Sequence, residues 1–170
     1  MPTTRRRLGD AARGLVGGLV GTSVMTATLK LEQLLVGDQR GPVDYDASDH
    51  VVTAAATVLH RRPKTVAGNK ALFLLVHWGY GSAVGVGYPV LLHAVAPRAR
   101  YAGAGALFYA GCQTMAMTLF PTLGGTPPPW RWSRRILLSS LAQHAVYASV
   151  VASVVRALAP EEVRTSGRAG

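Results

Sequence analysis

The chain has 170 residues, of which 49% are hydrophobic and 15% are charged. An average soluble domain carries about 25% charged residues, and a chain of this length has a large surface that charge normally covers. The composition therefore argues against an ordinary soluble enzyme, and the apolar content argues against a disordered basic tail. The net charge of +10 comes from the stretch between His50 and Pro160, which has ten Lys and Arg and no acidic residue.

Four apolar runs follow one another along the chain, at 11–36, 70–96, 101–123 and 136–158. Each is long enough for a helix to cross ~30 Å of hydrocarbon, which needs roughly 20 residues. Only helices and closed barrels satisfy their backbone groups in lipid, and these runs are too long for barrel strands. A soluble bundle of buried helices is the alternative, but the last two runs have no charged face to meet water.

We therefore predict an all-α fold, an integral membrane four-helix bundle that forms one membrane domain over 11–158. A basic cytoplasmic tail at 1–10 precedes this domain, and a disordered tail at 159–170 follows it. The arginines at 5–7 before an apolar stretch are also typical of a signal sequence, but no clear cleavage site follows them. A first transmembrane helix is favoured, and its arginines place both termini in the cytoplasm.

Glycines recur at short spacing in three of the runs. They are Gly14, Gly17, Gly18 and Gly21, then Gly79, Gly81, Gly85 and Gly87, then Gly103, Gly105 and Gly111. Glycine weakens a helix in water by about 1 kcal/mol, whereas in lipid it lets neighbouring backbones approach closely. The spacing therefore predicts close packing between helices.

A short helix is predicted between the first two spans, inside the polar segment 37–69. The residues that offer N-caps for it are Asp46, Ser48 and Asp49, and the basic residues and proline at 60–63 end it. Its apolar face consists of Val51, Val52, Ala55 and Leu59. Such a helix lies either at the membrane interface or against the bundle.

Four ionisable residues inside the spans form a candidate ligand or ion site: Lys30, Glu32, His77 and His144. Antiparallel spans place Lys30 and Glu32 within ~9 Å, His77 within ~10 Å and His144 within ~13 Å of the same side. The cluster could relay protons or hold a polar ligand, and its imidazoles could bind a metal or haem iron. Alternatively, Lys30 and Glu32 extend to the interface while the histidines form hydrogen bonds between helices. Lys30 and Glu32 do not share a helix face, so Glu32 needs another partner.

Catalysis of the kind found in soluble enzymes is not predicted. Ser139 and Ser140 lie one turn before His144, but no acid is nearby to complete a triad. The single Cys112 excludes an intramolecular disulfide and a cysteine-based zinc site, and we predict no metal and no cofactor. The basic residues are scattered at the ends of spans, which favours anionic lipids over nucleic acid as their partner.

The segment between the last two spans predicts a membrane-interface anchor. Three consecutive prolines, 127–129, form a stiff connector. Two tryptophans and three arginines follow: Trp130, Arg131, Trp132, Arg134 and Arg135. Aromatic and basic side chains together are typical of the headgroup region.

The same segment carries a resemblance. The motif runs from Pro121 to Trp130 as PTLGGTPPPW, is followed by His144-Ala-Val146-Tyr147, and closes with Val155-Arg156. It resembles the YagU-like family of uncharacterised bacterial inner-membrane proteins, at motif level over 121–147 and in outline over most of 10–158. That family has a proline-rich segment where this chain has only Gly41-Pro42, and an acidic residue where it has Ser140. The resemblance implies an integral membrane protein and no established reaction.

These observations together predict a multi-pass protein of the bacterial inner membrane that is not an enzyme. Its expected role is structural or accessory, with the bilayer, anionic lipids and a second copy or another membrane protein as partners. One alternative is a small oligomeric transporter or proton-linked channel that uses Glu32, His77 and His144. Another is a haem-binding or redox subunit.

Overall fold

The computed structural model describes residues 4–37, 47–95 and 100–159, and all the regular structure in these ranges is helical. The helices are α1 (Thr4–Val36), α2 (Ala47–Leu59), α3 (Val66–Gly85), α4 (Gly87–Ala94), α5 (Arg100–Leu123) and α6 (Arg134–Ala157), with a 3-10 turn, η2, at Pro129–Arg131. The predicted all-α class is therefore confirmed.

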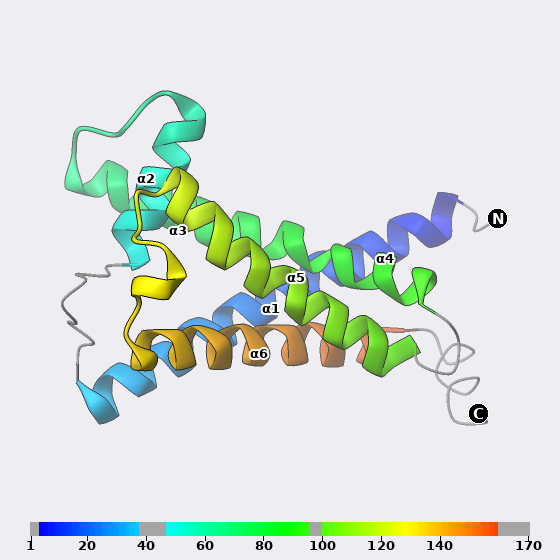
Figure 1. Cartoon of the computed structure of the whole chain (residues 1–170). Coiled ribbons are helices and arrows are strands. Elements are labelled where there is room, and N and C mark those ends of the chain that lie inside the picture. Colours follow the sequence, from blue (N-terminus) through cyan, green and yellow to red (C-terminus); the bar gives the residue numbers. More distant parts are fainter. Residues whose placement is uncertain (1–3, 38–46, 96–99, 160–170) are drawn as a thin grey trace.

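The long helical segments alternate in direction, as Figure 1 shows. α1 runs from right to left in that view, α3 and α4 return together, α5 runs leftward and α6 returns. One end of the fold, called the α2 end below, holds α2, the end of α1 and the start of α6. The opposite end, called the α4 end, holds α4, the start of α1 and the end of α6.

Two helices are long and apolar enough to cross a membrane, by length and composition, in the described ranges: Arg6–Leu35 and Arg134–Ala157. The first of these lies in α1, which begins at Thr4 and thus extends well before the predicted span at 11–36. Residues 4–10, predicted as a tail, are thus the first turns of that helix. Of the predicted tail at 159–170, residues 160–170 lie outside the described residues.

The run at 70–96, predicted as one span, contains two helices. α3 ends at Gly85, and α4 begins at Gly87 after Val86. The cause is Pro89, which has no N–H and whose ring clashes with the carbonyl of the residue four positions before it, here Gly85. The second apolar run is therefore two helices with a break.

The buried core lies where α4, α5 and α6 meet. The ring of Phe108 packs against Tyr88 at 5.5 Å and against Tyr147 at 5.9 Å between centroids. Val151 and Ala104 beside them are fully buried. Aromatic pairs of this kind contribute about 0.5–1.5 kcal/mol beyond the area they bury, so this cluster joins three helices at one point.

The glycines of α1 pack on two different helices. A β-carbon at Gly14 would lie 2.6 Å from the Cα of Val86, between α3 and α4. One at Gly21 would lie 2.9 Å from the ring of Tyr147 on α6. The prediction of close packing is confirmed for this helix, because side chains at either position would push the neighbouring helix away.

Other glycines face open space. A β-carbon at Gly79, Gly105 or Gly111 would meet nothing within 4 Å. For contacts between helices of the same chain, the prediction of close packing is therefore wrong at these three positions. Spacing alone could not separate the two groups, because it does not tell which face of a helix meets a neighbour.

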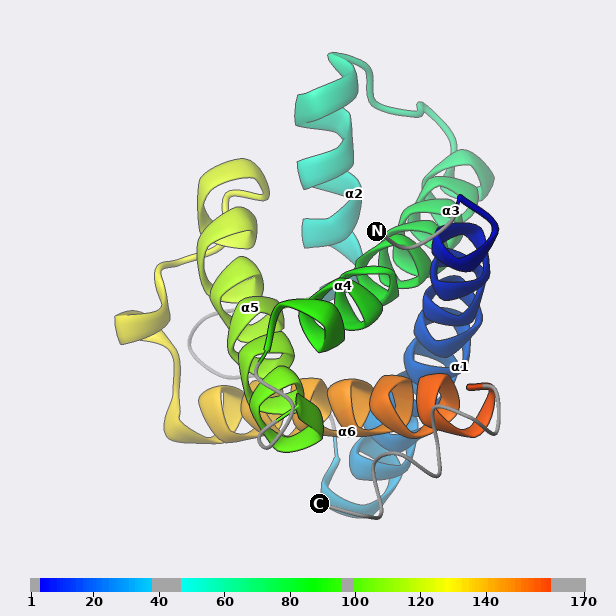
Figure 2. The ribbon, with the colours of Figure 1, turned by 90° about the vertical axis from the view of Figure 1, so that its right-hand side faces the viewer.

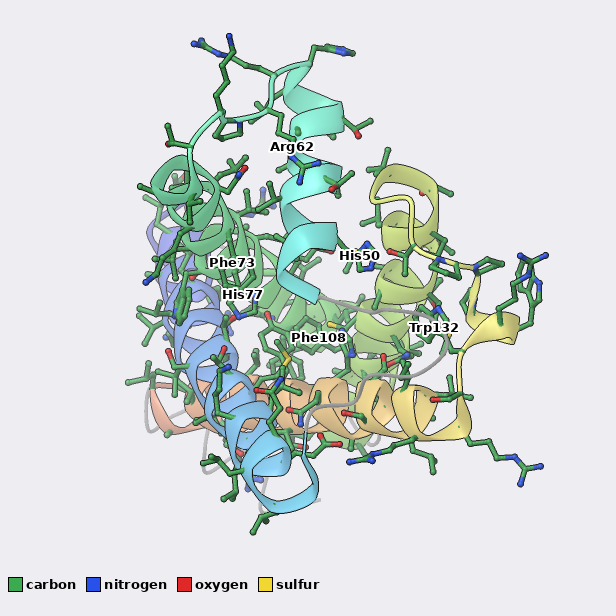
Figure 3. The ribbon with its side chains drawn as sticks, turned by 90° about the vertical axis from the view of Figure 1, so that its left-hand side faces the viewer. His50, Arg62, Phe73, His77, Phe108 and Trp132 are labelled. Carbon is green, nitrogen blue, oxygen red and sulfur yellow. The ribbon has the colours of Figure 1, made fainter. Side chains whose placement is uncertain are left out.

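The predicted short helix is present as α2, and it packs against α3 and α5. Val51 and Val52 are buried, whereas Leu59 at its end is exposed. His50 points toward α5 (Figure 3), and its Nδ1 lies 3.2 Å from the carbonyl oxygen of Gly124. Packing of α2 against the bundle, which was one of the two alternatives, is therefore present in the structure.

Candidate functional site

Glu32 is bound by α6. Its Oε2 accepts hydrogen bonds from Ser139 Oγ at 2.8 Å and from Gln143 Nε2 at 3.2 Å. The amide oxygen of Gln143 in turn accepts from Thr28 Oγ1 at 2.7 Å. Thr28 and Glu32 are one turn apart on α1, as are Ser139 and Gln143 on α6, so two facing turns form a single polar contact. The partner that Glu32 was expected to need is therefore α6.

His77 faces α1 from α3. Its Nε2 lies 2.9 Å from Thr26 Oγ1, and its ring stacks on Phe73 at 5.1 Å between centroids. Figure 3 shows both rings on α3 beside α1. The next residue, Trp78, donates from Nε1 to Ser23 Oγ at 3.2 Å. Two hydroxyl groups of α1 thus form hydrogen bonds with two ring nitrogens of α3.

His144 and Lys30 have other surroundings. His144 Nδ1 lies 2.8 Å from the carbonyl oxygen of Ser140, one turn earlier on its own helix. Lys30 is exposed and donates to Gln33 Oε1 at 3.0 Å. The four predicted site residues therefore have four different sets of partners. In the described ranges, His, Cys, Asp and Glu side chains do not gather in threes as a metal site would require.

The two tryptophans of the predicted anchor differ in position. Trp130 in η2 is 82% exposed, and the arginines Arg131, Arg134 and Arg135 are exposed as well. Trp132 is buried, and its Nε1 donates to the carbonyl oxygen of Pro127 at 2.7 Å. Figure 3 shows Trp132 at the start of α6. It fixes the proline connector, while Trp130 extends into the surroundings.

A second polar group, at the α4 end, was not predicted. His93 Nε2 on α4 lies 3.0 Å from Asp10 Oδ2 on α1, and Arg13 forms an ion pair with the same carboxylate. Antiparallel spans place the end of the second apolar run beside the start of the first. That signal could have paired His93 with Asp10 from the sequence.

Comparison of the chain with protein-family models, with curated proteins and with solved structures gives no match.

Proposed function

We propose that this chain is a multi-pass protein of the bacterial inner membrane with a structural or accessory role. Its spans would be α1, the α3–α4 pair, α5 and α6. The observation that carries the proposal is the low burial of the two apolar helices: 28% of the apolar window in α1 and 22% of that in α6 is buried. The core helix of a soluble protein is mostly buried, because its apolar side chains gain by leaving water.

The exposed side of α1 supports this proposal. Leu15, Val16, Leu19 and Val20 are all exposed in the middle of the helix. They fall on adjacent turns and form one apolar face. A continuous exposed apolar surface of this kind is typical of contact with lipid or with another apolar protein surface.

The contacts between the helices support it as well. Interfaces between membrane helices are rich in small residues and use Ser, Thr, Gln and His for hydrogen bonds. Here Gly14 and Gly18 of α1 meet α3, and Thr28 meets Gln143 of α6. Since these polar groups bond to neighbouring helices, the contacts favour a role in holding the bundle together. The similarity of 121–147 to the YagU-like family agrees with a membrane protein of this kind.

The proposal is tested by alkaline carbonate extraction of membranes from cells that express the full chain. We expect the protein to stay in the membrane pellet and to leave it only with detergent. Release by carbonate alone would refute integral insertion. Reporter fusions at positions 55 and 165 should then report opposite compartments, because α2 and the end of α6 lie at opposite ends of the fold.

Glu32 favours a second candidate, a small proton-linked channel or transporter. An ionisable residue inside a membrane span is costly and commonly marks a transport path, and this one is half-buried between α1 and α6. Proton flux into liposomes with the reconstituted chain tests this candidate. Equal flux in the unmodified chain, Glu32→Gln and His144→Ala would refute it.

A further inference from the structure

The α4 end contains a cavity of about 90 Å³ between α1, α4, α5 and α6. Figure 2 looks onto this end of the fold. A cavity needs only ~10–15 Å³ to hold one water, so this one has room for a larger polar group. The cavity is bounded by side chains from four helices, which is how ligand sites between bundle helices are built.

The polar lining is rich in arginine. It comprises Arg6, Arg13, Arg156, His93, Tyr101 and one carboxylate, Asp10. Asp10 is already matched by Arg13 and His93. The guanidinium groups of Arg6 and Arg156 therefore leave the lining with an excess of positive charge, which favours an anion.

Arg156 is held in place by an aromatic ring. Its guanidinium carbon lies 5.1 Å from the centroid of Tyr101 at the start of α5. The neighbouring Val155 is buried and fixes this turn of α6 in the core. A guanidinium held over a ring face by a cation–π contact still has its N–H groups available to donate to an anion. Arg156 is thus a preorganised donor at the cavity.

The remaining lining is apolar and includes Pro89, Leu92 and Val155. An inorganic anion needs no apolar wall, whereas a phospholipid has a charged phosphate joined to a hydrocarbon body. Basic pockets between membrane helices at the headgroup level bind anionic lipids in this way. Arginines beside an apolar wall therefore favour an anion that carries a hydrocarbon body, such as an anionic phospholipid, over an inorganic ion.

We propose that this cavity binds a phosphate-bearing anion, presented as the headgroup of an anionic phospholipid. The source of the phosphate rests on the proposed function, because it requires the α4 end to lie at a membrane surface. Arg6 and Arg156 bind the phosphate, Tyr101 orients Arg156, and Pro89 and Leu92 contact the upper part of the lipid chains.

The test uses the full chain, purified in a neutral detergent and freed of lipid. Binding of phosphatidylglycerol, of phosphatidylcholine and of inorganic phosphate is measured separately by native mass spectrometry and by the shift in thermal midpoint. We expect phosphatidylglycerol to bind with preference over phosphatidylcholine. Arg156→Gln and Arg6→Gln should each weaken that binding by about fivefold, the effect of one arginine at a membrane surface.

Two variants make the result specific. Arg156→Lys keeps the charge and should retain most of the preference, and it also covers the case in which Arg156→Gln fails to fold. Arg61→Gln removes an exposed arginine just after α2, at the α2 end, and should leave binding unchanged.

Each outcome decides the proposal. Binding of inorganic phosphate that is lost in Arg156→Gln supports the site and assigns it to a soluble phosphate. Equal binding of both phospholipids without phosphate binding, or equal binding by the wild-type chain and both glutamine variants, overturns it. A chain that resists carbonate extraction but shows no such preference would refute this inference alone and leave the membrane proposal standing.

Discussion

Gly85 of α3 and Gly18 of α1 cross in direct backbone contact. A β-carbon at Gly85 would lie 2.7 Å from the Cα of Gly18, closer than real β-carbons come to other atoms. Because the neighbour is backbone and not a flexible side chain, it cannot move aside alone. The distance between α1 and α3 therefore depends on the absence of two methyl groups.

Gly18→Ala should destabilise the protein by about 1–3 kcal/mol, the usual cost of overpacking a tight contact. The matched control is Gly79→Ala, because Gly79 lies on the same pair of helices but has open space beside it. The thermal midpoint in detergent measures both. A midpoint in Gly18→Ala equal to that of Gly79→Ala would contradict the contact.

The hydroxyl of Tyr147 provides a second prediction. It donates to the carbonyl oxygen of Gly81 at 2.5 Å, across the buried contact between α6 and α3. Tyr147→Phe keeps the ring that packs on Phe108 and loses only this bond, so we expect a loss of about 1 kcal/mol. Tyr109→Phe is the control, because its hydroxyl makes a longer bond of 3.4 Å to Leu141. Equal losses in both variants would show that the hydroxyl of Tyr147 makes no special contribution.

The polar contact of Glu32 is best measured by a double-mutant cycle. Glu32→Ala, Ser139→Ala and the double variant are unfolded in detergent, and the coupling free energy is calculated from the three losses. A hydrogen bond to a charged group contributes about 1.5–3 kcal/mol, so we expect a coupling of about 1 kcal/mol or more. The control pair is Glu32→Ala with Ser153→Ala, since Ser153 bonds within its own helix. A coupling free energy of zero between Glu32 and Ser139 would show that this hydrogen bond does not stabilise the fold.

The two tryptophans should respond differently to the same substitution. Trp132→Phe loses the bond to Pro127 and leaves a smaller ring in a buried place, so we expect a loss of about 1–3 kcal/mol. Trp130→Phe should leave stability within about 0.5 kcal/mol, as exposed substitutions usually do. Urea or heat denaturation followed by circular dichroism checks both. A larger loss at Trp130 than at Trp132 would reverse their assigned roles.

Several elements could be predicted from the sequence because local chemistry decides them. The start of α6 follows the prolines at 127–129, and α2 ends at Leu59, just before the basic residues at 60–63. The break at Val86 was also present in the sequence, since Pro89 cannot continue a helix without cost, but the long apolar run concealed it.

The candidate site was harder to predict. The depth of Glu32, His77 and His144 along their helices follows from residue counting, but the direction in which each side chain points does not. Glu32 turns toward α6, while His77 turns toward α1 and His144 bonds to its own backbone. Rotation of each helix about its axis is set by packing, for example by Gly18 against Gly85. Such contacts join residues distant in sequence, and a single chain's pattern does not reveal them.

The two glycine faces of α1 have a consequence for biosynthesis. α1 precedes the other described helices along the chain, but one of its faces is covered by α3 and the other by α6, the last helix of the described chain. A nascent chain that has reached α5 therefore still carries Gly17, Gly21 and Glu32 without their partners. Packing of the described helices around α1 is therefore complete only once α6 has been made, and until then that face of α1 is left exposed.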